Sequence, residues 1–89
     1  MNSSTKWDLV ITKPAEKSLS KFPAKDRAKI QSALVEMREN PFAGDIARLK
    51  TQPSAWRRRV GSYRILYDIL PDRLLIVVVG IVRRTSTTY

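Results

Sequence analysis

Residues 55–69 read AWRRRVGSYRILYDI, and this stretch is predicted to form a β-hairpin with strands at about Ala55–Val60 and Tyr63–Ile69. Gly61 and Ser62 would be its two-residue turn, because glycine favours such turns and strand-forming residues flank the pair. Four of the fifteen residues are arginines. A strand at the surface needs some charge for solubility, but not this much of one sign. The hairpin therefore raises the question of which anion its guanidinium groups face.

Upstream of the hairpin, the chain is predicted to form one strand and two helices. Trp7–Ile11 alternates apolar and polar residues, as a short strand does. Thr12 can cap a first helix that has a proline in its first turn. A second helix runs from about Ala24 to Glu39 and is stopped by Asn40-Pro41. Its apolar residues follow the i, i+3, i+4, i+7 pattern of a buried helix face: Ile30, Ala33, Leu34 and Met37.

The rest of the chain supplies a loop, a turn and a last strand. Residues 42–54 are expected to be a loop, and Pro71–Arg73 is expected to be a turn. The continuous apolar run Leu74–Val82 predicts a strand that is buried on both faces. The order β-α-α-β-β-β predicts an α+β fold, in which a small, mainly antiparallel, twisted sheet has two helices packed on one face. Residues 1–89 are expected to form a single domain.

Composition narrows the classes of partner and of chemistry. The formal net charge is +9, from 17 basic and 8 acidic residues, and this predicts a polyanion or an acidic protein as partner. The chain has no cysteine and no histidine, which excludes structural zinc sites, disulfides, thiol nucleophiles and imidazole acid–base chemistry. There is no apolar signal region, and the longest apolar run is too short to span a bilayer. A cytoplasmic location and no membrane partner are expected.

Strand alternation predicts where the arginines point. Arg57, Arg59 and Arg64 would share the sheet face that the helices leave bare. The alternation of the last strand would bring Arg83 to the same face. Four forked donors on one face would form an anion site suited to phosphate. The opposite, apolar row would meet the helices and comprises Tyr63, Ile65, Tyr67 and Ile69.

Some features of this surface leave alternatives open. Arg58 breaks the pattern, because its alternation points inward beside Trp56; it is expected near an edge, with its charge reaching outward. A basic open face can also be only a solvated surface, or a docking face for an acidic protein. Trp56, Tyr63 and Tyr67 are interpreted as core residues rather than as platforms for base stacking.

The chain resembles the RelE branch of the RelE/ParE superfamily, the toxins of bacterial and archaeal toxin–antitoxin modules. The segments that carry the resemblance are Leu49-Lys50, the hairpin from Trp56 to Tyr67, the apolar strand that leads to Arg83-Arg84, and Tyr89. The order of strands and helices matches as well, so the resemblance covers nearly the whole chain.

The resemblance implies an mRNA interferase that enters the ribosomal A site. The RNA's own 2′-hydroxyl attacks the adjacent phosphate, so no metal and no cofactor are needed. A cognate antitoxin and the ribosome with its mRNA are the implied partners. The implied catalytic residues are Arg57, Arg59, Arg64, Arg83 and Tyr89. The implied RNA-binding residues are Lys50, Arg57, Arg58, Arg59 and Arg84.

Two departures from the family pattern bear on the chemistry. Arg57 and Arg59 stand where the best-known members have lysines, and arginine does not give up its proton in proteins. The sequence stops at Tyr89, whereas some relatives continue into a further helix that contacts the antitoxin or controls activity. No general base is evident, and Asp68 is the only acid placed on the open face.

Two other functions are compatible with the same resemblance. One is a ParE-like inhibitor of DNA gyrase, which has the same fold and no RNA chemistry. The other is a basic RNA-binding or protein-binding module without catalysis. The complete set of four arginines and Tyr89 favours the ribonuclease, because a gyrase inhibitor has no need of residues that cleave a phosphodiester.

Overall fold

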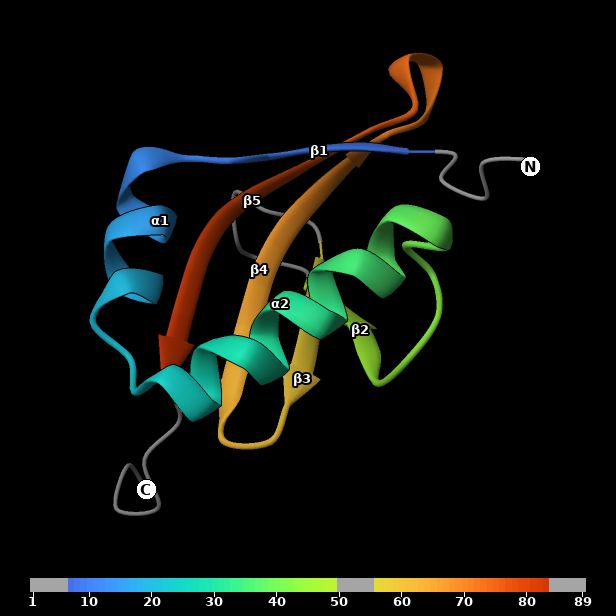
Figure 1. The fold of residues 1–89 in the computed structure, drawn as a ribbon. Helices are drawn as coiled ribbons and strands as arrows, with labels where there is room; N and C mark the ends of the chain where they lie inside the picture. The colour runs from blue at the N-terminus through green and yellow to red at the C-terminus, as the bar shows by residue number, and fades with distance from the viewer. Residues whose placement is uncertain (1–6, 50–55, 84–89) are drawn as a thin grey trace, which may run out of the picture.

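The computed structural model describes residues 7–49 and 56–83 (Figure 1). The elements in chain order are β1 (Asp8–Ile11), α1 (Lys13–Ser20), α2 (Ala24–Glu39), β2 (Ile46–Arg48), β3 (Trp56–Val60), β4 (Tyr63–Leu70), the 3₁₀ turn η1 (Pro71–Arg73) and β5 (Leu75–Arg83). The strands form one sheet in the order β1-β5-β4-β3-β2. Only the β1–β5 pair is parallel. The predicted α+β fold, with a mainly antiparallel sheet and two helices, is confirmed.

One strand was not predicted. Residues 46–48 lie inside the segment expected to be a loop, yet they form β2, which pairs with β3 at the edge of the sheet. Three residues are too few to show a strand pattern in the sequence. Its pairing comes instead from contact with β3, which lies beyond the undescribed residues 50–55.

The two helices start and stop close to the predicted residues. Pro14 lies in the first turn of α1, where its missing N–H costs nothing. Thr12 occupies the capping position, but its side chain makes no cap bond. Its hydroxyl instead donates to the Val79 carbonyl oxygen at 3.3 Å, which ties the start of α1 to β5. Asn40 ends α2 in an extended conformation.

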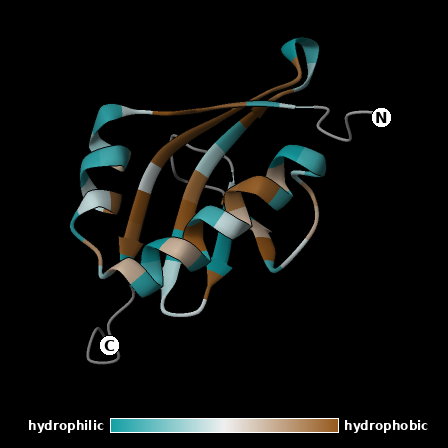
Figure 2. Cartoon of the chain, viewed as in Figure 1, coloured by the Kyte–Doolittle hydropathy of each residue, from teal (hydrophilic) through white to brown (hydrophobic). Residues whose placement is uncertain are grey.

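The core lies between the helices and one face of the sheet (Figure 1). Figure 2 shows hydrophobic colour along β5, whereas most of α1 is hydrophilic. Ile65, Ile76 and Val78 are fully buried, and complete burial of such a side chain typically stabilises a fold by about 1.5–3 kcal/mol. The helices contribute Ala15, Leu19, Ile30, Ala33, Leu34 and Met37. None of the helices in the described segments is long and apolar enough to cross a bilayer.

The β3–β4 hairpin forms as predicted, with Gly61 at φ 57° in its turn. Beyond it, the pairing of β4 with β5 contains a β-bulge. Leu66 pairs with Gly80 and Tyr67 pairs with Val78, so Val79 is an extra residue on β5. The bulge changes which residues of β5 face the helices from that point onward.

The prediction that the last strand is buried on both faces is wrong. Ile76, Val78 and Ile81 are buried on the helix side, whereas the other residues of β5 are half-buried or exposed. Val82 is 45% exposed. The open face carries no covering layer in the described part of the chain, so a long apolar run does not by itself prove burial on both faces.

Candidate functional site

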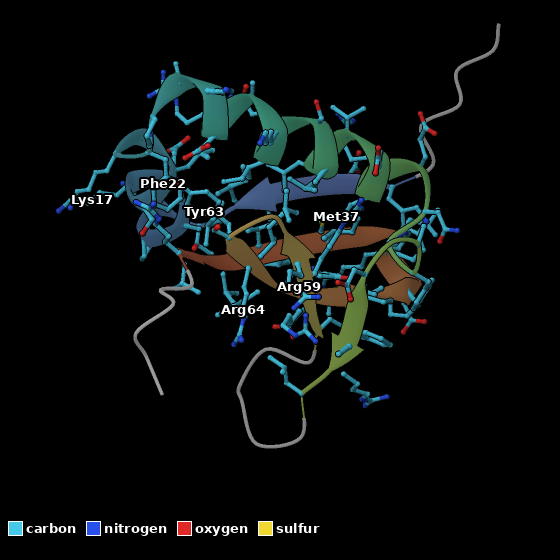
Figure 3. All side chains as sticks on the ribbon, turned by 90° about the horizontal axis from the view of Figure 1, so that it is seen from below. Lys17, Phe22, Met37, Arg59, Tyr63 and Arg64 are labelled. Atoms are coloured by element: carbon cyan, nitrogen blue, oxygen red, sulfur yellow. The ribbon has the colours of Figure 1, made fainter. Side chains whose placement is uncertain are left out.

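Three of the predicted site arginines lie on the open face of the sheet, next to the β3–β4 turn. Arg59 pairs with Arg64, and Arg57 pairs with Leu66. Arg58, which lies between them on β3, pairs with the buried Ile65 and faces the helices. Figure 3 shows Arg59 and Arg64 on the side of the sheet away from α2. The predicted placement of Arg57, Arg59 and Arg64 on one face is confirmed.

The Arg59–Arg64 pair is unfavourable in the protein alone. Residues directly opposite on antiparallel strands have their Cβ atoms about 4.5–5.5 Å apart, and like charges there destabilise the sheet. Arg64 is also half-buried, and its Nε has no hydrogen-bond partner within the described residues. A buried donor without a partner typically costs about 1–3 kcal/mol. A bound anion would relieve the repulsion between the two guanidinium groups, so this pair is the centre of the candidate site.

Asp45 is an acidic neighbour of the site that the sequence reasoning missed. Its carboxylate Oδ2 accepts a hydrogen bond from Arg59 Nε at 3.1 Å, and its carbonyl oxygen accepts one from the Arg59 backbone N–H at 2.9 Å. Asp45 directly precedes β2. Asp68 is therefore not the only acid near these arginines, and the expectation that it would be is wrong. Asp45 was missed because residues 42–54 were expected to be a loop. The edge strand β2, which pairs with β3, brings Asp45 alongside Arg59.

The predicted position of Arg83 on the open face is wrong. Arg83 pairs with Tyr63, whose side chain is buried on the helix side. The extra residue at Val79 shifts the alternation of β5 by one, and the residues after it exchange faces. Arg83 is exposed at the end of β5 and lines a shallow pocket with Asp26, Lys29, Val60, Gly61, Ser62 and Tyr63. Arg83 therefore lies on the helix side of the β3–β4 turn, whereas Arg59 and Arg64 lie on the open side.

Two tyrosines on the helix side are structural groups. The Tyr63 hydroxyl donates to Asp26 Oδ2 at 2.6 Å. This hydrogen bond raises the pKa of Tyr63, burial raises it further, and Arg83 offsets part of the increase. The Tyr67 hydroxyl donates to the Pro41 carbonyl oxygen at 3.0 Å. Burial raises the pKa of Tyr67, and Arg58 offsets part of this effect. Both hydroxyls are therefore neutral donors at ordinary pH, and both residues are in the core, as interpreted from the sequence.

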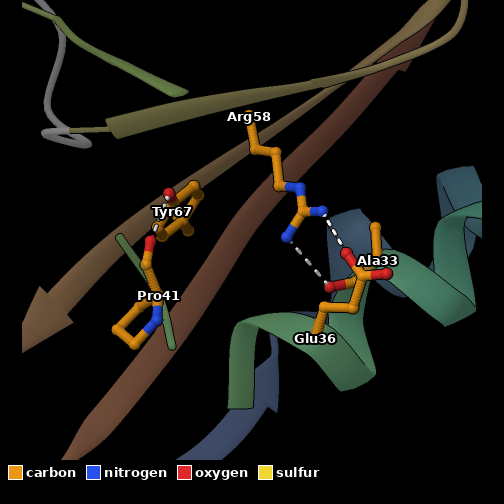
Figure 4. A network of polar contacts seen from close by, with 5 residues as sticks. All are labelled: Ala33, Glu36, Pro41, Arg58 and Tyr67. Carbon is orange, nitrogen blue, oxygen red and sulfur yellow. Dashed lines mark hydrogen bonds and ion pairs between the residues drawn. The ribbon is translucent and has the colours of Figure 1, made fainter. Parts of the chain in front are cut away.

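Arg58 points inward as the alternation indicated, but its expected exit to solvent at an edge is wrong. Only 8% of the residue is exposed. Its guanidinium donates to the Glu36 carboxylate and to the Ala33 carbonyl oxygen, both on α2 (Figure 4). Glu36 itself is largely exposed, so its carboxylate is not buried with Arg58. Arg58 thus joins β3 to α2 and is not placed to contact RNA in this structure.

Three further predicted site residues lie outside the described part of the chain: Lys50, Arg84 and Tyr89. Within the described part, no group of three or more acidic residues could hold a metal ion. The described functional groups are therefore cations, hydrogen-bond donors and the Asp45 carboxylate. Such a set can bind and stabilise an anion.

Comparison with solved structures shows that the chain has the fold of RelE proteins. RelE in its complex with RelB from Pyrococcus horikoshii superposes with a TM-score of 0.80 at 18% identity, covering 92% of this chain and 99% of that one. The isolated RelE toxin of Escherichia coli gives a TM-score of 0.77 at 19% identity, with 92% and 88% covered. The RelBE2 toxin–antitoxin complex of Mycobacterium tuberculosis gives 0.77 at 23% identity, with 89% and 99% covered.

Sequence comparison identifies the family. Residues 9–87 match the family model described as the ParE toxin of type II toxin–antitoxin systems, parDE. The RelE1 protein of Methanocaldococcus jannaschii is 30% identical over 82 residues, which cover 89% of this chain and 91% of that protein. The chain belongs to the RelE/ParE superfamily and is the toxin of a toxin–antitoxin module. Several of its structural neighbours are complexes of a toxin with its antitoxin.

Proposed function

We propose that this toxin is a ribosome-dependent endoribonuclease that cleaves mRNA in the ribosomal A site and so inhibits translation. The observation that supports this function is the opposed pair Arg59–Arg64 on the open face, in which the buried Arg64 Nε has no hydrogen-bond partner among the described residues. Two opposed guanidinium groups repel each other when no ligand is bound. A phosphate between them can accept hydrogen bonds from both and neutralise this repulsion. A phosphodiester is the anion that an RNA-cleaving member of this superfamily must hold.

The proposed reaction uses a nucleophile supplied by the RNA. The 2′-oxygen loses its proton and attacks the adjacent phosphorus, and the bond from phosphorus to the 5′-oxygen breaks. The products are a 2′,3′-cyclic phosphate and a 5′-hydroxyl, whose oxygen takes up one proton. Arg64 and Arg59 stabilise the negative charge that grows on the phosphorane-like oxygens, and Arg57 binds a neighbouring phosphate. Tyr89 is assigned to the 2′-hydroxyl, by position, stacking or proton transfer.

Arg83 requires a different place in this scheme because it lies on the helix side of the β3–β4 turn. We assign it to RNA that passes over Gly61-Ser62, from the open face toward the end of α2 that carries Lys29. The two groups of cations then contact different parts of one strand. Lys50 and Arg84 remain RNA-binding residues of the proposal.

The partners follow from the same charge. A cognate antitoxin with an acidic or amphipathic segment would cover the basic surface of this +9 chain and block its entry to the ribosome. The complexes among the structural neighbours support a partner of this kind. In the free state, the ribosome with bound mRNA is the proposed target, and the cytoplasm is the proposed location.

The second candidate function is inhibition of DNA gyrase by protein binding. The match of residues 9–87 to the ParE family model favours it. It does not require an opposed arginine pair, because a protein partner can be bound by a basic surface of many shapes. For this reason it is the alternative rather than the conclusion.

Primer extension on ribosome-bound mRNA separates these functions. The ribonuclease produces discrete cuts within the A-site codon that require the ribosome. The gyrase inhibitor leaves the mRNA intact and lowers supercoiling activity in a parallel assay. Intact mRNA together with normal supercoiling would indicate the third function, a binding module without catalysis. Arg64→Ala serves as the inactive control, and Arg73→Ala, at an exposed arginine in η1, serves as the control for removal of one positive charge.

A further inference from the structure

The inward Arg58 holds a turn that lies beside the candidate site. Its guanidinium is fixed from one side by α2, through Glu36 and the Ala33 carbonyl oxygen (Figure 4). From another side it lies against Gly44. Because Arg58 is almost completely buried, this contact is part of the packed interior. Gly44 itself is exposed, so the buried Arg58 side chain supports this turn from its inner side.

Gly44 is the residue that allows this close approach. A Cβ at this position would lie 2.9 Å from Arg58 Cζ, closer than real Cβ atoms approach other atoms, and 3.0 Å from its Nε and Nη2, which is tighter than most Cβ contacts. The φ angle of Gly44 is +89°, which residues with side chains rarely adopt. The turn is closed by a hydrogen bond from the Ile46 N–H to the Gly44 carbonyl oxygen at 3.0 Å. This turn therefore places the next residue, Asp45, beside Arg59 at the edge of β3.

Asp45 holds Arg59 by two bonds from one residue. The backbone bond to the Arg59 N–H fixes the register, and the carboxylate accepts from Nε at 3.1 Å. A guanidinium bound at Nε keeps its terminal nitrogens on the opposite edge available. Within the described residues, neither terminal nitrogen of Arg59 makes a hydrogen bond. The ion pair is half-exposed, so it adds little stability. Its effect is on direction: it limits rotation of the Arg59 side chain.

We propose that Asp45 is a positioning residue that aims the terminal nitrogens of Arg59 at an RNA phosphate, with Gly44 and Arg58 as its support. The two consecutive arginines then serve one site in different ways. Arg58 braces the turn from inside, and Arg59 contacts the substrate from outside. The consequence for the reaction rests on the proposed ribonuclease function, whereas the contact itself does not.

The test compares Asp45→Ala and Asp45→Asn with Asp72→Ala. Asp72 is exposed in η1, so its removal changes the net charge by the same amount away from the site. Single-turnover cleavage of ribosome-bound mRNA gives a maximal rate and the toxin concentration at half-maximal rate. Asp45→Ala should lower the maximal rate about tenfold, since small misplacements of a catalytic group cost one to two orders of magnitude, and should leave the half-maximal concentration within about twofold of Asp72→Ala. Asp45→Asn keeps an acceptor and should recover part of the rate.

A second readout does not depend on cleavage. Nitrogen-15 NMR of the Arg59 Nε–Hε group should show faster exchange of Hε with water in Asp45→Ala than in wild type or Asp72→Ala. Titration with inorganic phosphate should shift this signal less in Asp45→Ala than in wild type. If wild type does not cleave RNA but these NMR differences appear, the proposed function fails and the positioning role stands.

Two results would overturn the positioning role. One is an Arg59 signal that is the same in Asp45→Ala and wild type, with and without phosphate. The other is Asp45→Ala cleaving as fast as Asp72→Ala or faster, because Asp45 would then be neutral or a competitor of the phosphate.

Discussion

The two faces of β3 carry neighbouring arginines with opposite surroundings. Arg58 is buried, braced by α2 and packed against Gly44. Arg59 is half-exposed, opposes Arg64, and is held only by Asp45 among the described residues. One residue type therefore joins two elements on one face and is proposed to bind the substrate on the other. The difference is that α2 accepts hydrogen bonds from both terminal nitrogens of Arg58, although its Nε has no partner, whereas no described residue accepts one from the terminal nitrogens of Arg59.

The largest effect is expected from Arg64→Ala. Loss of one preorganised donor at a developing charge lowers a reaction rate by about 10²–10³, while the fold should keep or gain stability because the like-charge pair is removed. Primer extension on ribosome-bound mRNA and a urea unfolding curve measure the two effects. Arg73→Ala is the matched control. Cleavage by a soluble, folded Arg64→Ala variant at the wild-type rate would contradict the assignment of Arg64 to the phosphate.

Arg58→Ala should have the opposite profile. It removes a packed side chain and two hydrogen bonds, so the free energy of unfolding should fall by about 2–3 kcal/mol. Arg59→Ala should change it by less than about 0.5 kcal/mol, as surface substitutions usually do. Urea unfolding with an unchanged m-value measures both. If the two variants lose equal stability, the distinction between the two faces does not hold.

Salt dependence gives a smaller but direct comparison. Each phosphate contact to single-stranded nucleic acid contributes about −0.7 to the slope of log binding constant against log salt concentration. Arg59→Ala should therefore reduce the slope for a single-stranded oligoribonucleotide by about that amount. Arg58→Met keeps most of the buried volume and should leave the slope unchanged, because the Arg58 guanidinium of the wild type is buried against α2. Equal slopes for wild type and Arg59→Ala would remove Arg59 from the RNA backbone.

The smallest effect is expected in the alkaline range. The folded-state pKa values of Tyr63 and Tyr67 are raised, so the unfolded chain ionises first as pH rises. Their contribution to stability is complete below pH about 10 and is lost as pH climbs toward the folded-state values. Unfolding curves between pH 8 and 11 should fall less steeply for Tyr67→Phe than for wild type. An identical pH dependence would show that Tyr67 does not carry this linkage.

The raised pKa values of Tyr63 and Tyr67 also make the pH test of Tyr89 more specific. An alkaline limb in cleavage below pH about 10 cannot come from Tyr63 or Tyr67, because their pKa values are raised. If Tyr89→Phe removes such a limb and slows cleavage, Tyr89 moves a proton in the reaction. If Tyr89→Phe keeps the rate and the limb while Tyr89→Ala is slow, Tyr89 acts by stacking.

The sequence by itself determined the features that depend on local periodicity. The helix at 24–39, the hairpin turn at Gly61 and the alternation of Arg57, Arg58 and Arg59 were all readable. The reason is that side-chain period and turn chemistry act over a few residues, and the pattern of apolar positions fixes which face is buried. Three of the four arginines assigned to the open face were placed correctly for this reason.

The tertiary structure alone decided the features that join distant segments. The bulge at Val79 depends on how β5 meets β4, and it moved Arg83 to the other side of the sheet. The pairing of β2 with β3 brought Asp45 to Arg59, across residues 49–55. The burial of Arg58 needed a helix carbonyl oxygen and a carboxylate that are 25 and 22 residues away in the chain. Register and ion pairing between separate elements are set by packing, and no window of the sequence contains both partners.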